Sequence, residues 1–468
     1  MIKNKILRFK SKCRKLLKCS TGGEFIRQLP FGYIEKMALL PGAMLLIAYI
    51  RHFLFSFFDT EALQFIPAYK SQYYSQAAVF AYICSALVIV LYLAKLRTVK
   101  GSIINCIKNY FKSSFPMVLL TVYFLFILLS PFINGFTTDA MKGVGNRFEP
   151  YYYLLSYYFC FIMPVTVVRK EKSIRLIVYS LIFLSIATAF MTLLKPSLAD
   201  GPFVYYNSGF FHNTNHYGYF LTMSIGLCAA MAVLEKNTKL RTAAIAGLVL
   251  NAAEQVLNNS FGSILSSIAA LMLLMIMLWI AKGKFVPASL AVFGLFMGVS
   301  LAAAFFFRPA YFLNFSFLSR DIKKILNETE DAGSAGSGRI RLWRYVGDLI
   351  AKRPFLGYGI EGMNRNMQQD LHTSVNRVHN EFLQYAQFYG VPAVAFYFSG
   401  CLGVFIRGLK NKKRLTDCNI AALTAAFAYL ANSFFGVSMY YTTPMFFLLL
   451  GIAMNINSPV AENTETAR

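Results

Sequence analysis

The sequence has few charged residues, and among them acidic ones are scarce. Of its 468 residues 14% are charged, with 21 Asp and Glu against 46 Lys and Arg, whereas 57% are hydrophobic. Soluble domains are about 25% charged and about 45–50% apolar. This shortage of charge argues against a soluble globular enzyme, a disordered chain and a coiled coil.

Motifs of nucleotide-dependent and metal-dependent enzymes are missing as well. The chain has no Walker A loop, no H-E-x-x-H sequence, no cluster of metal ligands and no dinucleotide-binding fingerprint. None of its eight Cys follows C-x-x-C spacing. All eight fall in predicted spans or on the side assigned below to the cytoplasm, where thiols stay reduced. We therefore expect no metal and no cofactor.

What the chain has instead is a series of apolar blocks. A helix of about 20 residues crosses the hydrocarbon core of a bilayer, so blocks of this length predict an all-α polytopic membrane protein with about twelve transmembrane helices. The expected spans are about 37–57, 76–95, 115–135, 149–168, 175–194, 215–234, 242–257, 261–281, 285–307, 381–406, 417–437 and 441–456.

The basic residues predict how these spans are oriented. With the N-terminus in the cytoplasm, about 30 of the 46 Lys and Arg lie on the inner side. Both termini are therefore expected to be cytoplasmic. Residues 1–36 are interpreted as a basic arm on anionic lipid rather than a nucleic-acid-binding segment, because the first apolar run begins too late for a signal peptide. This distribution explains the net charge of +25 without nucleic acid.

A long polar stretch, about 308–380, interrupts the apolar pattern between the ninth and tenth spans and is expected to be extracytoplasmic. Such long loops are usually functional or disordered. The expected organisation is a basic arm, nine spans, the long loop, three spans and a cytoplasmic tail. The corresponding residues are 1–36, 37–307, 308–380, 381–456 and 457–468.

Part of this loop has the pattern of folded structure. Residues 328–338 are flexible in composition. After them, apolar residues recur at helical spacing and predict a helix that ends before Pro354. A turn at 357–359 and a second short helix around 361–370 are expected to follow. The helical apolar residues are Ile340, Trp343, Val346, Leu349 and Ile350.

Candidate chemical groups gather on the outer side of this topology. No ATP is available there, so a bond-forming reaction needs a substrate that is already activated, and a lipid-linked diphosphate fits this need. His379, where the long loop re-enters the membrane, could take a proton from a sugar hydroxyl because histidine titrates near neutrality. The alternative is an interfacial histidine that only hydrogen-bonds the start of a helix.

Arginines on the same side are candidates for phosphate binding. Arg339 and Arg341 lie in the loop, close to an expected helix start at Gly338, and Arg147 lies in another outer loop. A guanidinium can pair with two phosphate oxygens at once, and a helix start adds free N–H groups. The alternative is an amphipathic helix with solvated arginines.

Two further polar features lie near the outer ends of spans. Glu254 is an acid near the end of a predicted span. Intramembrane acids are costly and often functional, although a hydrated helix end is the alternative. The tract 207–218 contains His212 and Asn215, whose side chains suit sugar hydroxyls but also suit an interfacial belt.

These segments resemble the O-antigen ligase and Wzy-type polysaccharide polymerase family. One is Ser337-Gly-Arg339 with Trp343 and Pro354-Phe-Leu-Gly-Tyr-Gly359. Another is His379-Asn380 followed by Gly390 and Ala393, against H-[NSQ]-x9-G-x-x-[GTV]. The third is Gly209-Phe-Phe-His-Asn-Thr-Asn215, similar to G-x-F-x-N-x-N.

The chain departs from the family pattern at two points. Ala393 stands at the last position of the ligase motif, where the family has Gly, Thr or Val. Many members carry S-R-G in the middle of the chain, and here Ser260-Phe-Gly262 stands in its place, so that arginine is missing. Arg147 and Arg341 are the candidates to replace it.

The resemblance implies a glycosyltransferase of the bacterial cell membrane that uses neither metal nor nucleotide sugar. Its donor would be a glycan on undecaprenyl diphosphate, with His379 activating the acceptor hydroxyl and Arg339 holding the diphosphate. Further substrate-binding candidates are Arg341, Arg147, Asn380, Trp343, His212, Asn215 and Glu254.

The expected activity is polymerisation of lipid-linked repeat units for capsule, exopolysaccharide or O-antigen. The expected partners are the lipid-linked donor and acceptor, the bilayer, a chain-length regulator and a flippase. Two alternatives stay open. One is a ligase that transfers polymer to a lipid or protein acceptor. The other is a polysaccharide transporter or flippase, in which polar residues would be buried across many spans.

Overall fold

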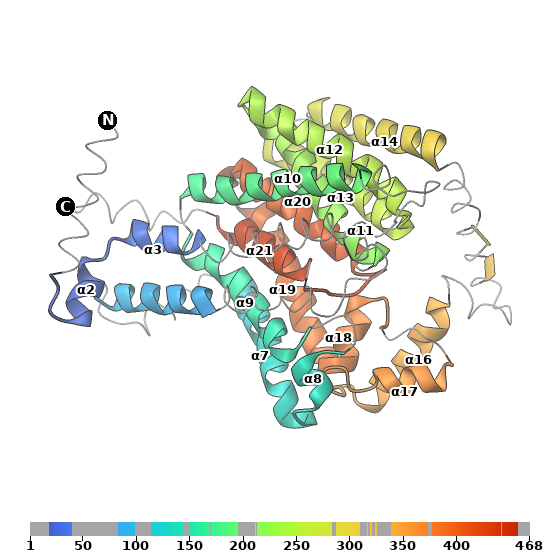
Figure 1. Ribbon diagram of the computed structural model, residues 1–468, viewed down its shortest axis with the longest axis horizontal. Helices are drawn as coiled ribbons and strands as arrows, with labels where there is room; N and C mark the ends of the chain where they lie inside the picture. Colours follow the sequence, from blue (N-terminus) through green and yellow to red (C-terminus); the bar gives the residue numbers. More distant parts are fainter. Residues whose placement is uncertain are drawn as a thin grey trace.

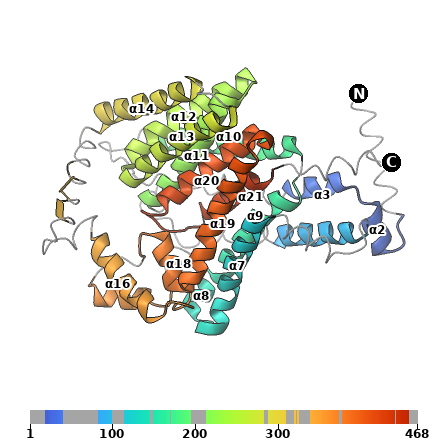
Figure 2. The same cartoon turned by 180° about the vertical axis from the view of Figure 1, so that it is seen from behind.

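The computed structural model is all-helical in the part of the chain that it describes. The described residues are 18–39, 83–98, 114–144, 149–168, 170–194, 211, 213–282, 287–308, 316, 319–320, 323–324, 338–372, 377–440 and 442–456. Two short helices, α2 (Gly22–Gln28) and α3 (Phe31–Met37), lie at one extremity of the molecule (Figures 1 and 2).

Six helices within the described residues are long and apolar enough to cross a membrane. They are α7 (Phe115–Asn134), α10 (Glu171–Leu194), α11 (Thr214–Leu234), α13 (Phe261–Lys282), α14 (Pro287–Phe307) and α19 (Val391–Lys410). Each lies where an apolar block predicted a span. The structure is therefore that of a helical membrane protein.

Other predicted spans coincide with helices that are shorter or more polar. These are α9 (Tyr151–Thr166), α12 (Thr238–Asn258), α20 (Asp417–Asn432) and α21 (Thr443–Met454), and residues 83–98 are also helical. Most of the expected first span, 37–57, lies outside the described residues. The total of twelve spans thus stays a prediction.

The expected span 381–406 is not one helix, and this prediction was wrong. A short helix, α18 (Glu381–Tyr389), ends at Gly390, and α19 begins directly after it. Gly390 has a φ of 90°, which glycine adopts without the strain that a Cβ would bring. Pro392 then suits the first turn of α19, where a missing N–H costs nothing. The break turns α18 into a separate element at the end of the long loop.

The bundle is centred on α11, which is almost entirely buried. It packs against α12, α13 and α20. A Cβ at Gly226 of α11 would lie 3.0 Å from the Cα of Ala425 in α20, so glycine permits a close approach of the two backbones. The central position of α11 places its polar first turns at the junction of several helix ends.

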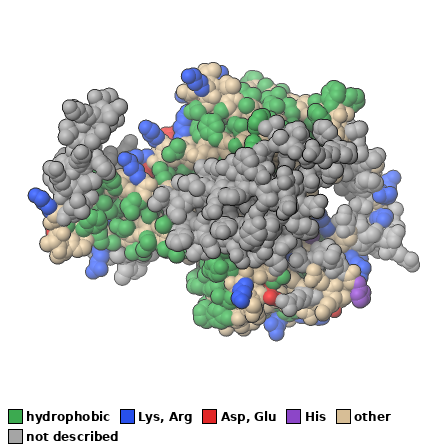
Figure 3. All heavy atoms as spheres, viewed as in Figure 1, with side chains coloured by type: hydrophobic (Ala, Val, Ile, Leu, Met, Phe, Trp, Pro, Cys, Tyr) green, Lys and Arg blue, Asp and Glu red, His purple; other side chains and the backbone are tan. Residues whose placement is uncertain are grey.

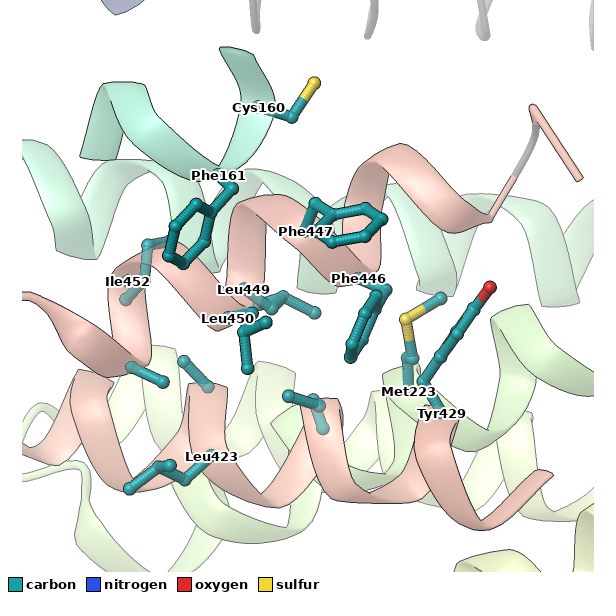
Figure 4. Close-up of a cluster of buried hydrophobic side chains, with 14 of the residues drawn as sticks. Cys160, Phe161, Met223, Leu423, Tyr429, Phe446, Phe447, Leu449, Leu450 and Ile452 are labelled. Atoms are coloured by element: carbon teal, nitrogen blue, oxygen red, sulfur yellow. The ribbon is translucent and has the colours of Figure 1, made fainter. Parts of the chain in front are cut away.

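A second part of the core joins α9, α11, α20 and α21. Figure 4 shows Phe161 of α9 facing α21, and Met223 of α11 beside Tyr429 of α20. The rings of Tyr429 and Phe446 stack with centroids 4.3 Å apart, and such aromatic pairs contribute about 0.5–1.5 kcal/mol beyond the burial of their area. This packing fixes the Tyr429 ring, whose hydroxyl belongs to the candidate site.

The surface is consistent with a lipid environment. In Figure 3 hydrophobic side chains are exposed over much of the described surface in view, and acidic side chains are few. Exposed apolar residues include Phe132 of α7, Trp279 of α13 and Phe305 of α14. In water such a surface would be an association or aggregation site.

The described part of the long loop folds as predicted. Helix α16 (Arg339–Lys352) ends before Pro354, and α17 (Asn364–Asp370) lies within the expected 361–370. Leu342 and Val346 of α16 pack with Met367 and Val378 in a small apolar cluster. Two further short elements, α8 (Thr138–Lys142) and η6 (Lys412–Arg414), lie outside the long loop. Both views place α16 beside α18 (Figures 1 and 2).

Candidate functional site

Polar groups gather where one end of the bundle meets the long loop. The centre of this group is Glu381, the first residue of α18, which is 0% exposed. Its carboxylate accepts hydrogen bonds from Tyr397 of α19 at 3.0 Å, from Tyr429 of α20 at 2.9 Å, and from Ser433, which follows α20, at 3.2 Å. These hydrogen bonds tie α18 to α19 and to the end of α20.

Tyr219 connects Glu381 to the first residue of α16. The Tyr219 hydroxyl, on α11, lies close to Glu381 and Ser433, and it interacts electrostatically with the guanidinium of Arg339. Arg339, Tyr219 and Glu381 belong to three different helices, and Tyr219 precedes Arg339 by 120 residues. The fold therefore brings the three motif-bearing segments to one place.

Arg339 is a half-buried cation at the start of α16. Burial lowers the pKa of its guanidinium from the ordinary value, and the neighbouring Tyr219 acts in the opposite direction. An arginine nevertheless keeps its charge in proteins. A partly desolvated cation at a helix start suits the binding of an anion such as a phosphate group.

His379 has a backbone conformation that is uncommon for a residue other than glycine. Its φ is 53°, in the left-handed region, which for a non-glycine residue costs about 1–3 kcal/mol. Surrounding contacts hold it there. The indole N–H of Trp343 donates to the carbonyl of Val378 at 2.9 Å, and the Val378 N–H donates to Oε1 of Gln384 at 3.1 Å.

The residues that follow His379 are fixed in the same way. The Asn380 side chain caps α18 by accepting a hydrogen bond from the Leu383 N–H at 3.0 Å. The Glu381 N–H donates to the carbonyl of Ser433 at 2.8 Å. The two residues next to His379, Val378 and Asn380, are thus bonded to the protein. Contacts outside the turn therefore maintain its strained backbone.

The glycine-rich turn of the loop docks on the junction of α18 and α19. The N–H of Tyr358 donates to the carbonyl of Gln387 at 2.8 Å, and the N–H of Val391 donates to the carbonyl of Pro354 at 2.7 Å. A Cβ at Gly357 would lie 2.6 Å from the Gln387 carbonyl oxygen, and one at Gly390 would lie 2.2 Å from that of Phe355. Gly357 and Gly390 are therefore both needed for the close backbone contact between the turn and the junction of α18 and α19.

A buried ion pair joins the turn before α17 to the segment before His379. Arg377 donates to Glu361, and both side chains are at most 3% exposed. Asn364 of α17 also donates to Glu361. Removing one partner of a buried pair leaves an uncompensated charge, at a cost of about 3–5 kcal/mol. The pair fixes the end of the long loop close to the site.

Helix α16 is also tied to the end of α17 on its exposed side. The Tyr345 hydroxyl donates to Asp370, and burial together with this bond raises the pKa of Tyr345 to about 12. Arg341 is exposed, and its guanidinium donates to the carbonyl of Leu371 at 3.4 Å. Arg341 therefore lies on a different face from the site-facing Arg339.

The polar start of α11 lies at the same end of the bundle. The Asn213 side chain caps the helix by accepting from the N–H of Asn215 at 2.8 Å. Glu254, near the end of α12, is 0% exposed and accepts a hydrogen bond from the Tyr217 hydroxyl at 3.0 Å. The Glu254 side chain is therefore buried inside the protein rather than exposed at the helix end.

The position of the missing family arginine also falls at this end. Phe261 is the first residue of α13. Beside it, the Ser260 and Ser263 hydroxyls lie 2.8 Å apart, and Ser263 donates to Asn432 of α20 at 3.4 Å. Ala393, the other departure from the motif, is fully buried in α19. A small apolar residue fits the packing at that place.

The structure brings some of the predicted residues together and leaves others apart. Arg339 lies within reach of Tyr219, and Trp343 and Asn380 support the backbone on either side of His379. Asn215 is in the first turn of α11, and Glu254 of α12 contacts Tyr217 of that helix. Arg147 and His212 are outside the described residues. No group of three or more His, Cys, Asp or Glu in the described part of the chain could hold a metal ion.

The prediction from sequence missed the residues around Glu381. The rule that an acid in a span is functional by default singled out Glu254, and the same rule would have found Glu381 at the start of an expected span. The other residues missed carry hydroxyls in apolar helices, which have no local signature. They are Tyr219, Tyr397, Tyr429 and Ser433.

A comparison with protein families gives one match, to the family described as O-antigen ligase, over residues 244–398. The matched segment runs from within α12 to within α19 and contains Glu254, Arg339, Trp343 and His379. A search of curated proteins finds no match to the chain.

Proposed function

We propose, from the match of residues 244–398 to the family described as O-antigen ligase, that the protein is a membrane glycosyltransferase. The proposed donor is an oligosaccharide repeat unit on undecaprenyl diphosphate. The proposed acceptor is the non-reducing end of a second lipid-linked unit, so that the product is a growing polysaccharide. The site would face the extracytoplasmic side, with both termini in the cytoplasm of a bacterial cell.

In the proposed reaction His379 is the general base and Arg339 holds the leaving group. A bond forms between the acceptor oxygen and the anomeric carbon of the donor, and the bond from that carbon to the phosphate oxygen breaks. The proton of the acceptor hydroxyl passes to the His379 imidazole, and the electron pair of the broken bond leaves with undecaprenyl diphosphate. The Arg339 guanidinium stabilises the charge that develops on the diphosphate.

The observation that carries this proposal is the convergence of Arg339, Tyr219 and Glu381 at one end of the bundle. Glu381 is only two residues from His379. A half-buried cation and a candidate base are thereby brought to the same region, where an anionic leaving group and a sugar alcohol could meet. Removal of a general base lowers a rate by about 10²–10⁴-fold.

Two departures from the family pattern favour polymerase over ligase. The arginine of S-R-G is absent at position 261, and Ala393 stands at the end of the ligase motif. The second candidate is a ligase, which would transfer the polymer to a lipid core or a protein. It is supported by the description of the matching family itself.

The test is incubation of the purified protein with lipid-linked repeat unit as the sole substrate. A polymerase makes a ladder of products, because the substrate serves as both donor and acceptor. His379→Ala should abolish the ladder while the protein is still expressed and folded. His372→Ala is the matched control, because His372 is an exposed residue of the loop.

Two results would count against the proposal. A product that forms only when a separate lipid or protein acceptor is added identifies the ligase. A ladder of normal length from His379→Ala removes His379 from the mechanism.

A further inference from the structure

We propose that Glu381 is a positioning residue, which sets the start of α18 and thereby the place of His379 in the site. The importance of this placement for catalysis rests on the proposed function. The contacts that argue for the positioning role do not depend on the proposed function. They concern only the way in which the turn that carries His379 is attached to the bundle.

The carboxylate of Glu381 is occupied by partners inside the protein. Oε1 accepts from Tyr397 at 3.0 Å, and Oε2 accepts from Tyr429 and Ser433 at 2.9 and 3.2 Å. The Tyr219 hydroxyl lies close to it as well. An ionised carboxylate has about four acceptor sites, so little capacity is left for a substrate. Glu381 therefore acts on the site through the protein.

These contacts attach α18 to two other helices. Tyr397 belongs to α19, whereas Ser433 follows α20 and receives the backbone N–H of Glu381 at 2.8 Å. The backbone N–H and the side chain of Glu381 are thus both bonded to residues at the C-terminal end of α20. Because α18 has only nine residues, this anchor at its first residue determines where the helix begins.

His379 lies between this anchor and a second one. Upstream, the carbonyl of Val378 receives the indole N–H of Trp343. Downstream, Asn380 alone separates His379 from Glu381. A left-handed residue keeps its conformation only while its surroundings over-determine it. Loss of the Glu381 anchor should therefore release the turn on one side and move the imidazole.

The substitution that tests this role is Glu381→Gln, which keeps the shape of the side chain. It replaces one acceptor oxygen with a donor, so the hydroxyls of Tyr397, Tyr429 and Ser433 can no longer all donate to it. The matched control is Asp348→Asn, which makes the same change at an exposed position of α16.

The measurement is the rate at which diethyl pyrocarbonate acylates His379 in the full-length protein, followed by peptide mass spectrometry across a pH series. Glu381→Gln should change this rate several-fold and shift its pH dependence. The exposed His372 is an internal reference and should not change. In the transfer assay the same variant should lose up to about 100-fold in rate, the effect of a displacement of ~1 Å.

Milder variants cover the case in which Glu381→Gln does not fold. Tyr397→Phe and Ser433→Ala each remove one donor to the carboxylate and should give smaller changes at His379 in the same direction. If every folded variant of this set has the wild-type acylation rate and pH dependence at His379, the proposal is overturned.

The two readouts separate this inference from the proposed function. Altered acylation in Glu381→Gln, together with full transfer activity in His379→Ala, would support the positioning role but reject the catalytic one. Unaltered acylation, together with loss of transfer in His379→Ala, would reject the positioning role alone.

Discussion

At the scale of single residues, the site depends on charged groups that are removed from water. Glu381 is fully buried, and Arg339 is half-buried at the start of a helix. Interactions of partly buried charges are stronger and less screened by salt than those at a surface. A half-buried guanidinium such as that of Arg339 is therefore better suited to bind an anion than an exposed arginine is.

The Arg339 side chain gives the first prediction at this scale. Arg339→Ala should lower the transfer rate by about 10²–10³-fold, the typical effect of removing one group that stabilises developing charge. Arg339→Lys should recover part of this loss, because an ammonium keeps the charge but lacks the planar fork of donors. Arg341→Ala, on the exposed face of the same helix, is the control. Equal rates in all of these proteins would refute the role of Arg339.

The burial of position 339 also predicts how the activity of a lysine variant depends on pH. Burial lowers the pKa of a cationic group, as it does for Arg339, but arginine stays protonated at any physiological pH. A lysine at this position starts from a lower pKa, so burial brings it closer to neutrality. Arg339→Lys should therefore lose activity as the pH rises, relative to the wild type at the same pH. Parallel pH profiles of the two proteins would contradict this expectation.

At the scale of elements, the important feature is the docking of the glycine-rich turn on the junction of α18 and α19. Helix α18 is short, and isolated helices of this length are not stable in water. Its ends are fixed by contacts from elsewhere, namely Ser433 at the start and residues 354–359 at the end. The long loop and the bundle thus form one structural unit around His379.

Gly390→Ala tests this docking. The substitution places a Cβ at a φ of 90° and 2.2 Å from the carbonyl oxygen of Phe355. The backbone strain alone costs about 1–3 kcal/mol, so the thermal unfolding temperature should fall. Gly347→Ala is the matched control, because a Cβ there meets nothing within 4 Å and lies inside α16. In that helix alanine should be neutral or stabilising. Equal unfolding temperatures in the two variants would argue against the docking.

At the scale of the whole molecule, the question is which compartment the site faces. Helix α19 has 20 residues, which at 1.5 Å per residue is about 30 Å, the thickness of the hydrocarbon core. Its first residue lies at the candidate site, and η6 follows its last residue. The site and η6 should therefore lie on opposite sides of the membrane.

Cysteine labelling in sealed cells tests this topology. In a background without the native cysteines, Asp348→Cys on α16 and Lys412→Cys on η6 place single thiols at exposed positions. A membrane-impermeant maleimide should label Asp348→Cys in intact cells, and Lys412→Cys only after permeabilisation. Labelling of Asp348→Cys only after permeabilisation would place the site in the cytoplasm and defeat the proposed reaction.

Much of the helical framework was predictable from sequence alone. Apolar blocks of span length and the helical spacing of Ile340, Trp343 and Val346 are local patterns, and a helix is stabilised by bonds within its own segment. The expected α16 and its end before Pro354 are confirmed. The break at Gly390 was missed, because an apolar run does not show where a helix stops and restarts.

The sequence by itself determined the class of protein, the positions of most described helices, and the motif residues His379 and Arg339. Only the tertiary structure decided that Tyr219, Tyr397, Tyr429 and Ser433 surround Glu381. The physical reason is that a buried carboxylate needs hydrogen-bond donors from whichever helices pass nearby. These donors come from three different helices, and no local pattern records which hydroxyls meet.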